Sequence, residues 1–216
     1  MLQPQRAKGL LFLLDRVVII DFETTGLSTN GGDRVIEVGA VSVENGTAAG
    51  SYQSLVNPGR RVSSFIESYT GISNHMLSTA PTADDVFPQL HRFIDGAVII
   101  AHNASFDRKF HDAELARVGY FRTQPFLCSM RIARRLYPNS PNHKLGTLVK
   151  YAGVPVTGDF HRALADAEMT GGLWIKMMDL LAQEYGFTRL ELPLLQKLER
   201  LPIAHTREWL SKQVSA

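Results

Sequence analysis

The chain has 216 residues and a formal net charge of +2, and this length suits one globular domain with extensions. Because 44% of the residues are hydrophobic and 20% are charged, the disordered and fibrous classes are excluded. The single cysteine, Cys128, excludes an intramolecular disulfide framework and a cysteine-rich zinc site, and it is consistent with a reducing cytoplasm.

Residues 1–14 are expected to form a helical N-terminal extension. Their apolar run, residues 10–14, is shorter than the roughly seven residues of a signal-peptide core, and Asp15 and Arg16 close it. No stretch approaches the roughly 20 apolar residues of a membrane span. We therefore expect a soluble, cytoplasmic protein without a membrane partner.

Three strands are predicted at the start of the domain that follows, residues 15–185. The β-branched run 17–22 is typical of a buried strand. Residues 34–43 and 47–56 predict two further strands, joined through an Asn-Gly turn. Together they favour an antiparallel meander.

Strands and helices alternate further along. The pattern predicts strands at 97–101 and 125–128 and helices at 82–95, 104–118, 129–136, 143–152 and 162–182. Strands first, then strands alternating with helices, predict an α/β fold: a mixed sheet with an antiparallel meander and parallel strands, flanked by helices. Residues 186–216 predict a helical C-terminal extension in two pieces, 188–200 and 203–213, that packs on the domain or binds a partner.

Positive charge is concentrated in residues 107–150. This segment holds nine lysines and arginines against three acids, a local net charge of +6. Such a segment can contact nucleic-acid phosphates, although a solvated helix face explains any one of these residues equally well.

Two acids, Asp21 and Glu23, end the first strand. They are two residues apart, so both side chains emerge on the same face of the sheet. Adjacent carboxylates repel each other unless a cation or a proton lies between them, and their oxygens suit a hard divalent cation. The alternative is an ordinary polar strand end. Gly26 follows closely and lets the backbone approach a ligand.

Two further segments carry candidate residues. Residues 101–107 run from a strand into a helix whose first turn holds Asp107, where an acid also favours the helix dipole and Asn103 can act as a cap. In residues 161–166, a continuous helix would turn His161 and Asp166 about 140° apart. They converge more easily if His161 lies in the loop before the helix. Histidine is the natural general base at neutral pH, although a surface position is the alternative.

The ordered set DFETTG (21–26), HNASFD (102–107) and HRALAD (161–166) closely resembles the DEDDh family of 3′–5′ exonucleases. This family shares a ribonuclease H-like fold and includes the proofreading epsilon subunit of bacterial DNA polymerase III, ribonuclease T and oligoribonuclease. The resemblance spans about residues 15–182, so residues 15–185 are expected to be the exonuclease domain. All five family positions are filled, by Asp21, Glu23, Asp107, His161 and Asp166.

The resemblance implies two Mg²⁺ or Mn²⁺ ions, held by the four acids, with His161 taking a proton from the attacking water. It also implies a set of residues that hold the terminal nucleotide: Thr24, Thr25, Gly26, Leu27, Asn103 and Phe106. Core packing is the alternative for Leu27 and Phe106.

The expected function is removal of nucleoside 5′-monophosphates from single-stranded 3′ ends of DNA, in proofreading or repair. RNA 3′-end trimming is the alternative within the same enzyme class. A non-catalytic module that binds nucleic acid or a polymerase is the alternative of another class, and the intact five-residue set counts against it. Residues 186–216 can dock on a polymerase subunit or mediate self-association.

Overall fold

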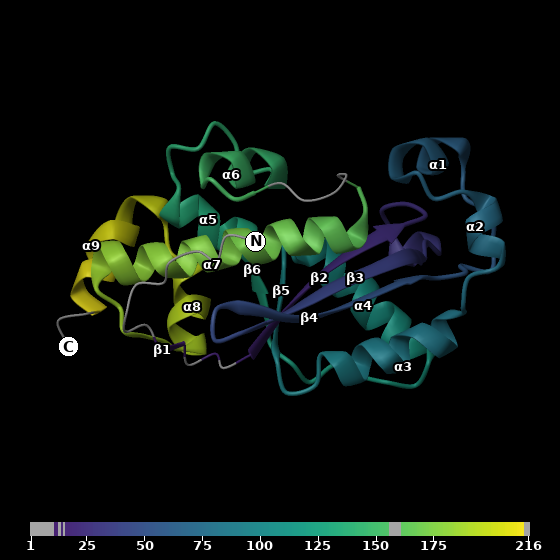
Figure 1. Ribbon diagram of the computed structural model, residues 1–216, viewed down its shortest axis with the longest axis horizontal. Helices are drawn as coiled ribbons and strands as arrows, with labels where there is room; N and C mark the ends of the chain where they lie inside the picture. Colours follow the sequence, from purple (N-terminus) through teal and green to yellow (C-terminus); the bar gives the residue numbers. More distant parts are fainter. Residues whose placement is uncertain (1–10, 13, 15, 156–160, 214–216) are drawn as a thin grey trace.

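A mixed five-stranded sheet forms the centre of the protein (Figure 1). The computed structural model describes residues 11–12, 14, 16–155 and 161–213. The strand order is β4-β3-β2-β5-β6; β2, β3 and β4 pair antiparallel, whereas β5 and β6 run parallel to β2. The strands are β2 (Arg16–Thr24), β3 (Val35–Glu44), β4 (Thr47–Leu55), β5 (Val98–Ala101) and β6 (Phe126–Cys128). The predicted α/β fold with a meander and parallel strands is confirmed.

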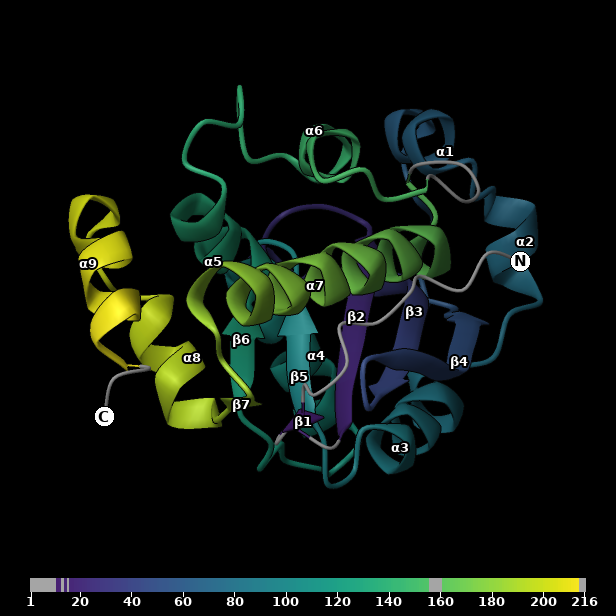
Figure 2. The same ribbon diagram turned by 60° about the vertical axis from the view of Figure 1, so that its left-hand side comes forward.

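Helices cover both faces of this sheet (Figure 2). The long helix α7 crosses one face, with α5 and α6 beside it, whereas α3 and α4 pack on the other. Their bounds are α3 (Ala83–Phe93), α4 (Ser105–Arg117), α5 (Ser129–Leu136), α6 (Leu145–Tyr151) and α7 (Ala163–Tyr185). All five lie within two or three residues of the helix ends predicted from the sequence.

Alternation along β2 decides where the acids emerge. Val17 and Ile19 join the core beneath α7, whereas Val18 and Ile20 join the core beneath α3. Because side chains alternate along a strand, Asp21 and Glu23 lie on the same face of the sheet as Val17 and Ile19, which is the face that α7 covers. The sheet thus presents them to the beginning of α7.

The segment between β4 and α3, for which the sequence predicted no element, contains two short helices, α1 (Ser64–Thr70) and α2 (Asn74–Ser78). The side chains of Ser63 and Ser73 accept hydrogen bonds from the first turns and so cap them. A single turn of 3-10 helix, η1 (Thr29–Gly31), follows β2.

The chain ends depart in part from the predictions. Leu11–Phe12 forms a strand, β1, which pairs in parallel with β7 (Arg189–Leu190), so these two residues are not helical as expected for 1–14. Residues 1–10 and 13 lie outside the described part of the chain. Strand β7 also replaces the start of the helix expected at 188–200, because an extended backbone there carries the buried Leu190 into the core.

Beyond β7, the described chain continues as α8 (Leu192–Leu198) and α9 (Ile203–Gln213). Leu195, Leu198 and Leu210 are buried in the core beneath α7. The residues after 190 thus pack on the domain. Among the described residues, no helix combines the length and the apolar character needed to span a bilayer.

Gly39 lets α7 begin directly against the sheet. It is the register partner of Asp21 on β3, and a Cβ atom at this position would lie only 2.1 Å from the carbonyl carbon of Ala163. Any side chain would therefore push the start of α7 away from the acids of β2.

We predict that Gly39→Ala destabilises the protein by about 1–3 kcal/mol, because it overpacks the contact between β3 and α7. For a chain of this size, Tm falls by roughly 2–4 °C per kcal/mol. Gly50→Ala on β4 is the matched control, because a Cβ there has no neighbour within 4 Å. Equal Tm values for the two variants, measured by thermal unfolding, would show that the close approach is unimportant.

Candidate active site

All eleven candidate site residues line one cavity of about 620 Å³ at the carboxyl end of β2. The five expected to be catalytic come from three separate segments, and the structure brings them together: Asp21, Glu23, Asp107, His161 and Asp166. The six expected to hold a nucleotide line the same cavity: Thr24, Thr25, Gly26, Leu27, Asn103 and Phe106.

Three elements deliver the four carboxylates. Asp21 and Glu23 come from β2, where a register shift against β3 follows Glu23. Asp107 lies in the first turn of α4 and is 2% exposed, whereas Asp166 lies in the first turn of α7. The parallel strand β5 carries α4 to the same end of the sheet as β2, so these acids converge.

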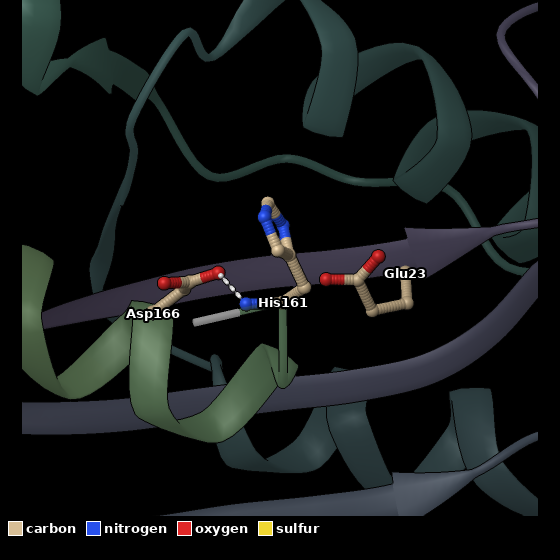
Figure 3. Close-up of side chains that lie close together, drawn as sticks. All are labelled: Glu23, His161 and Asp166. Carbon is tan, nitrogen blue, oxygen red and sulfur yellow. Dashed lines mark hydrogen bonds between the residues drawn. The ribbon is translucent and has the colours of Figure 1, made fainter. Parts of the chain in front are cut away.

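His161 lies just before α7, outside the helix, as the spacing in the sequence indicated. Its backbone is in the left-handed region, with φ at +66°, and its N–H donates a 3.1 Å hydrogen bond to Oδ2 of Asp166. Figure 3 shows the Glu23 carboxylate directed toward His161, with Asp166 on the other side. The imidazole packs against the ring of Tyr69, with the ring centroids 4.1 Å apart.

The four carboxylates disfavour one another's negative charge. Burial raises the pKa of Asp21 well above its ordinary value, and Asp107 and Asp166 raise it further. Burial and the charge of Asp166 raise the pKa of Glu23 to about 8. Burial raises the pKa of Asp107 to about 8, and that of Asp166 is also raised by burial despite the hydrogen bond from His161. At neutral pH the site therefore needs protons or cations.

The donor set fits a divalent cation. Oδ1 of Asp166 is buried and has no hydrogen-bond partner among the described residues. Ligand atoms of Glu23, His161 and Asp166 lie within 4.8 Å of one another. Carboxylate oxygens are the ligands that Mg²⁺ prefers, so this unsatisfied oxygen points to a metal centre.

Asp33 organises the loop after Glu23, and sequence reasoning missed it. It accepts a 2.9 Å hydrogen bond from Oγ1 of Thr25 and another from the backbone N–H of Ser28. A Cβ on Gly26 would meet the Asp33 carboxylate at 2.4 Å, so any side chain there would displace this carboxylate from Thr25 and Ser28. The loop leaves Leu27 77% exposed, which excludes core packing for that side chain.

The beginning of α4 forms another part of the cavity wall. Asn103 has φ at +67°; the cap position is Ala104, and Asn103 makes no side-chain capping bond. The half-buried ring of Phe106 packs on Phe110, with the centroids 4.9 Å apart, and still lines the cavity. Asn103 is thus available to a ligand, while Phe106 serves both the core and the cavity.

Helix α1 supplies a wall that sequence reasoning also missed. Tyr69 and Phe65 are stacked with centroids 5.8 Å apart, and both are at least half exposed while lining the cavity. Two aromatic residues four positions apart, on one face of a possible helix, are the signal that could have identified this wall.

A buried ion pair fixes the residue that follows His161. Glu37 on β3 is fully buried and accepts a 2.7 Å hydrogen bond from Nη2 of Arg162. The same carboxylate accepts hydrogen bonds from the backbone N–H of Ala163 at 3.0 Å and from Nε2 of Gln53 at 2.9 Å. These bonds hold both His161 and the start of α7 against the sheet.

We predict that Asp107→Asn raises Tm at pH 8 in EDTA, because the amide replaces a carboxyl group whose charged form is disfavoured by burial. With the folded-state pKa of Asp107 raised to about 8, its contribution to stability is full below its ordinary pKa of about 4 and is lost as pH rises through 8. The Tm difference from the parent protein should therefore shrink at pH 5.

The control is Asp84→Asn, at an exposed position on α3, for which we expect a change within about 0.5 kcal/mol at both pH values. A lower Tm for Asp107→Asn than for the parent protein at pH 8 in EDTA would contradict the cost of burying this charge.

Comparisons with known proteins agree with this geometry. An exonuclease family model, RNase_T, matches residues 18–173. The chain is 36% identical over 194 residues to a PolC-type DNA polymerase III from Caldanaerobacter subterraneus subsp. tengcongensis, covering 87% of this chain and 14% of that protein. It is 34% identical over 187 residues to the 3′-5′ exonuclease DinG of Bacillus subtilis, covering 86% of this chain and 19% of that protein. The chain thus spans less than a fifth of the length of these relatives.

Among solved structures, Exonuclease X in complex with 5′ overhanging duplex DNA superposes with a TM-score of 0.65 at 27% identity, covering 85% of this chain and 99% of that one. The family model covers most of the chain, and the five residues of the DEDDh pattern meet in one cavity. The chain belongs to the exonuclease family, and within it to the DEDDh type of 3′–5′ exonucleases.

Proposed function

We propose that the protein hydrolyses DNA from its 3′ end and releases nucleoside 5′-monophosphates in a metal-dependent reaction. The convergence of four mutually repelling carboxylates and one histidine in a single cavity carries this proposal. The PolC-type DNA polymerase III and Exonuclease X, which resemble this chain, favour DNA as the substrate.

The four acids would hold two Mg²⁺ or Mn²⁺ ions. Two such ions, when bound, stabilise both the attacking and the leaving oxygens of an in-line phosphoryl displacement. The chain's own contribution is to hold the carboxylates of Asp21, Glu23, Asp107 and Asp166 close together in one cavity. The partnerless Oδ1 of Asp166 supports this role.

His161 would act as the general base. Imidazole is the side chain most often used as a general base, and one ring nitrogen of His161 lies within 4.8 Å of carboxylate oxygens of Glu23 and Asp166. The attacking water would give its proton to this ring, and the same ring would pass it on to solvent. The ring of His161 packs against Tyr69, and the Arg162–Glu37 ion pair fixes the next residue, so both restrict the position of the ring.

The terminal nucleotide would lie in the 620 Å³ cavity, between the loop after Glu23 and α1. Leu27, with its exposed side chain, and Phe106 offer apolar contacts to the base, a mode that tolerates any sequence. Gly26 would let the backbone of residues 24–26 approach the nucleotide closely, and Asn103 would supply a polar group to it.

Alternatives concern the substrate and the partner. RNA remains the rival substrate, because contacts to the 2′-hydroxyl decide between the sugars. A non-catalytic binding module is disfavoured by the complete set of five residues. The polymerase relatives favour association with a DNA polymerase, with residues 186–216 or self-association as candidate contacts; the cytoplasmic location stays a prediction.

We predict that single-stranded DNA is degraded from its 3′ end in Mg²⁺ or Mn²⁺, that EDTA stops the reaction, and that added metal restores it. Matched DNA and RNA oligonucleotides, resolved by gel and by chromatography of the released mononucleotides, test this directly. Asp21→Asn should lose the activity in every metal. Activity that persists in EDTA would contradict a metal-dependent reaction. A strong preference for RNA would contradict DNA as the substrate and favour RNA instead.

A further inference from the structure

A second cavity meets the first at the carboxylates. Its volume is about 960 Å³, and it shares five lining residues with the 620 Å³ cavity: Asp21, Tyr69, His102, His161 and Asp166. The rest of its wall comes mainly from α6 and the residues just before that helix. Figures 1 and 2 both place α1 near the beginning of α7 and α6 above the middle of that helix, with α6 nearer the β6 edge of the sheet. Two of the four acids, Asp21 and Asp166, thus lie at the junction of the two cavities.

The α6 wall carries positive charge and an exposed aromatic ring. Lys144 and Lys150 are both exposed and form no ion pair within the described part of the chain. The cavity's described lining contains no acid apart from Asp21 and Asp166. Tyr151 is 47% exposed at the wall. Basic groups that follow a backbone and rings that stack on bases are the combination that binds single-stranded nucleic acid.

The position of the reacting phosphate decides what occupies this cavity. On the proposed function, on which this inference rests, the terminal nucleoside fills the first cavity and its phosphate lies at the carboxylates. The nucleotide on the 5′ side of that phosphate must then continue on the far side of the acids. That side is the 960 Å³ cavity.

We propose that the cavity beneath α6 binds the substrate strand on the 5′ side of the scissile bond. Lys144 and Lys150 contact its backbone phosphates, and Tyr151 offers its ring to a base. The enzyme thereby prefers strands longer than the nucleotide it removes.

A rival path for the strand runs along α5. A third cavity, of about 470 Å³, is lined by several arginines, among them Arg108 and Arg134, together with the single acid Glu199. It shares only Asn103 with the first cavity and is lined by none of the four acids. A strand with its scissile phosphate at the acids cannot pass directly into it, which favours the α6 cavity.

The test compares two double variants that remove the same charge, Lys144→Gln/Lys150→Gln and Arg108→Gln/Arg134→Gln. For each, kcat/KM is measured with a single-stranded DNA 12-mer between ~50 and ~200 mM NaCl, because binding that depends on phosphate contacts weakens steeply over this range of salt. The p-nitrophenyl ester of thymidine 5′-monophosphate, which has no strand on its 5′ side, provides the reference rate for each protein.

In the lysine variant we expect the ratio of kcat/KM for the 12-mer to that for the ester to fall. The slope of log(kcat/KM) against log[salt] should become shallower by about 1.4, from roughly 0.7 per lost phosphate contact. The arginine variant should keep the parent ratio and slope.

An unchanged ratio and slope in the lysine variant, with the parent enzyme active on both substrates, would overturn the inference. A loss confined to the arginine variant would do the same and would place the strand along α5. A parent protein that acts on neither substrate would instead refute the proposed function.

Discussion

Four carboxyl groups crowd the end of strand β2. Burial raises the pKa values of Glu23 and Asp107 to about 8, and the charge of Asp166 also raises that of Glu23. In water these groups would ionise near pH 4. The protein therefore stores unfavourable free energy at this point, and the surrounding structure holds it in place. A divalent cation offsets the repulsion, so the same arrangement that lowers stability creates affinity for metal.

Several packing features keep the carboxylates together. Gly39 lets the start of α7 rest on β3 beside Asp21. The Glu37–Arg162 pair anchors the residue after His161 to the same strand, which keeps the backbone N–H of His161 on Asp166. Each feature acts on the junction between the sheet and α7. Small changes there are expected to alter the distances between acids, because a packed core does not deform continuously.

Two walls of different chemistry flank the acids. Helix α1 presents stacked aromatic rings to one cavity, and α6 presents lysines and Tyr151 to the other. An apolar wall suits a base, and a basic wall suits a phosphate backbone. On the proposed function, this division would give the site a direction along a nucleic-acid strand, with the hydrolysed bond at the junction of the two cavities.

The sequence predicted the sheet, because the alternation of side chains along a strand is a local signal. The order of the motifs also led to the expectation that the five motif residues meet, and they line one cavity. Segment 60–81 was missed because α1 and α2 span less than two turns each, and the exposed Phe65 and Tyr69 give no core pattern. The role of Glu37 was not visible, because its partner Arg162 lies 125 residues away. The short strand β1 was mistaken for helix, since an apolar run of a few residues fits both periods.

In the proposed reaction the four carboxylates and His161 have separate roles: the carboxylates hold the cations, and His161 moves a proton. The geometry permits a rival arrangement, because Glu23, His161 and Asp166 are close enough to share one ion. Mn²⁺ affinity and the rate of nucleotide release, measured side by side for His161→Gln, separate the two. If His161 is the general base, we expect the rate for His161→Gln to fall by about 10²–10⁴ while Mn²⁺ affinity is kept. An Mn²⁺ affinity that falls as far as the rate would make His161 a metal ligand and contradict its role as the base.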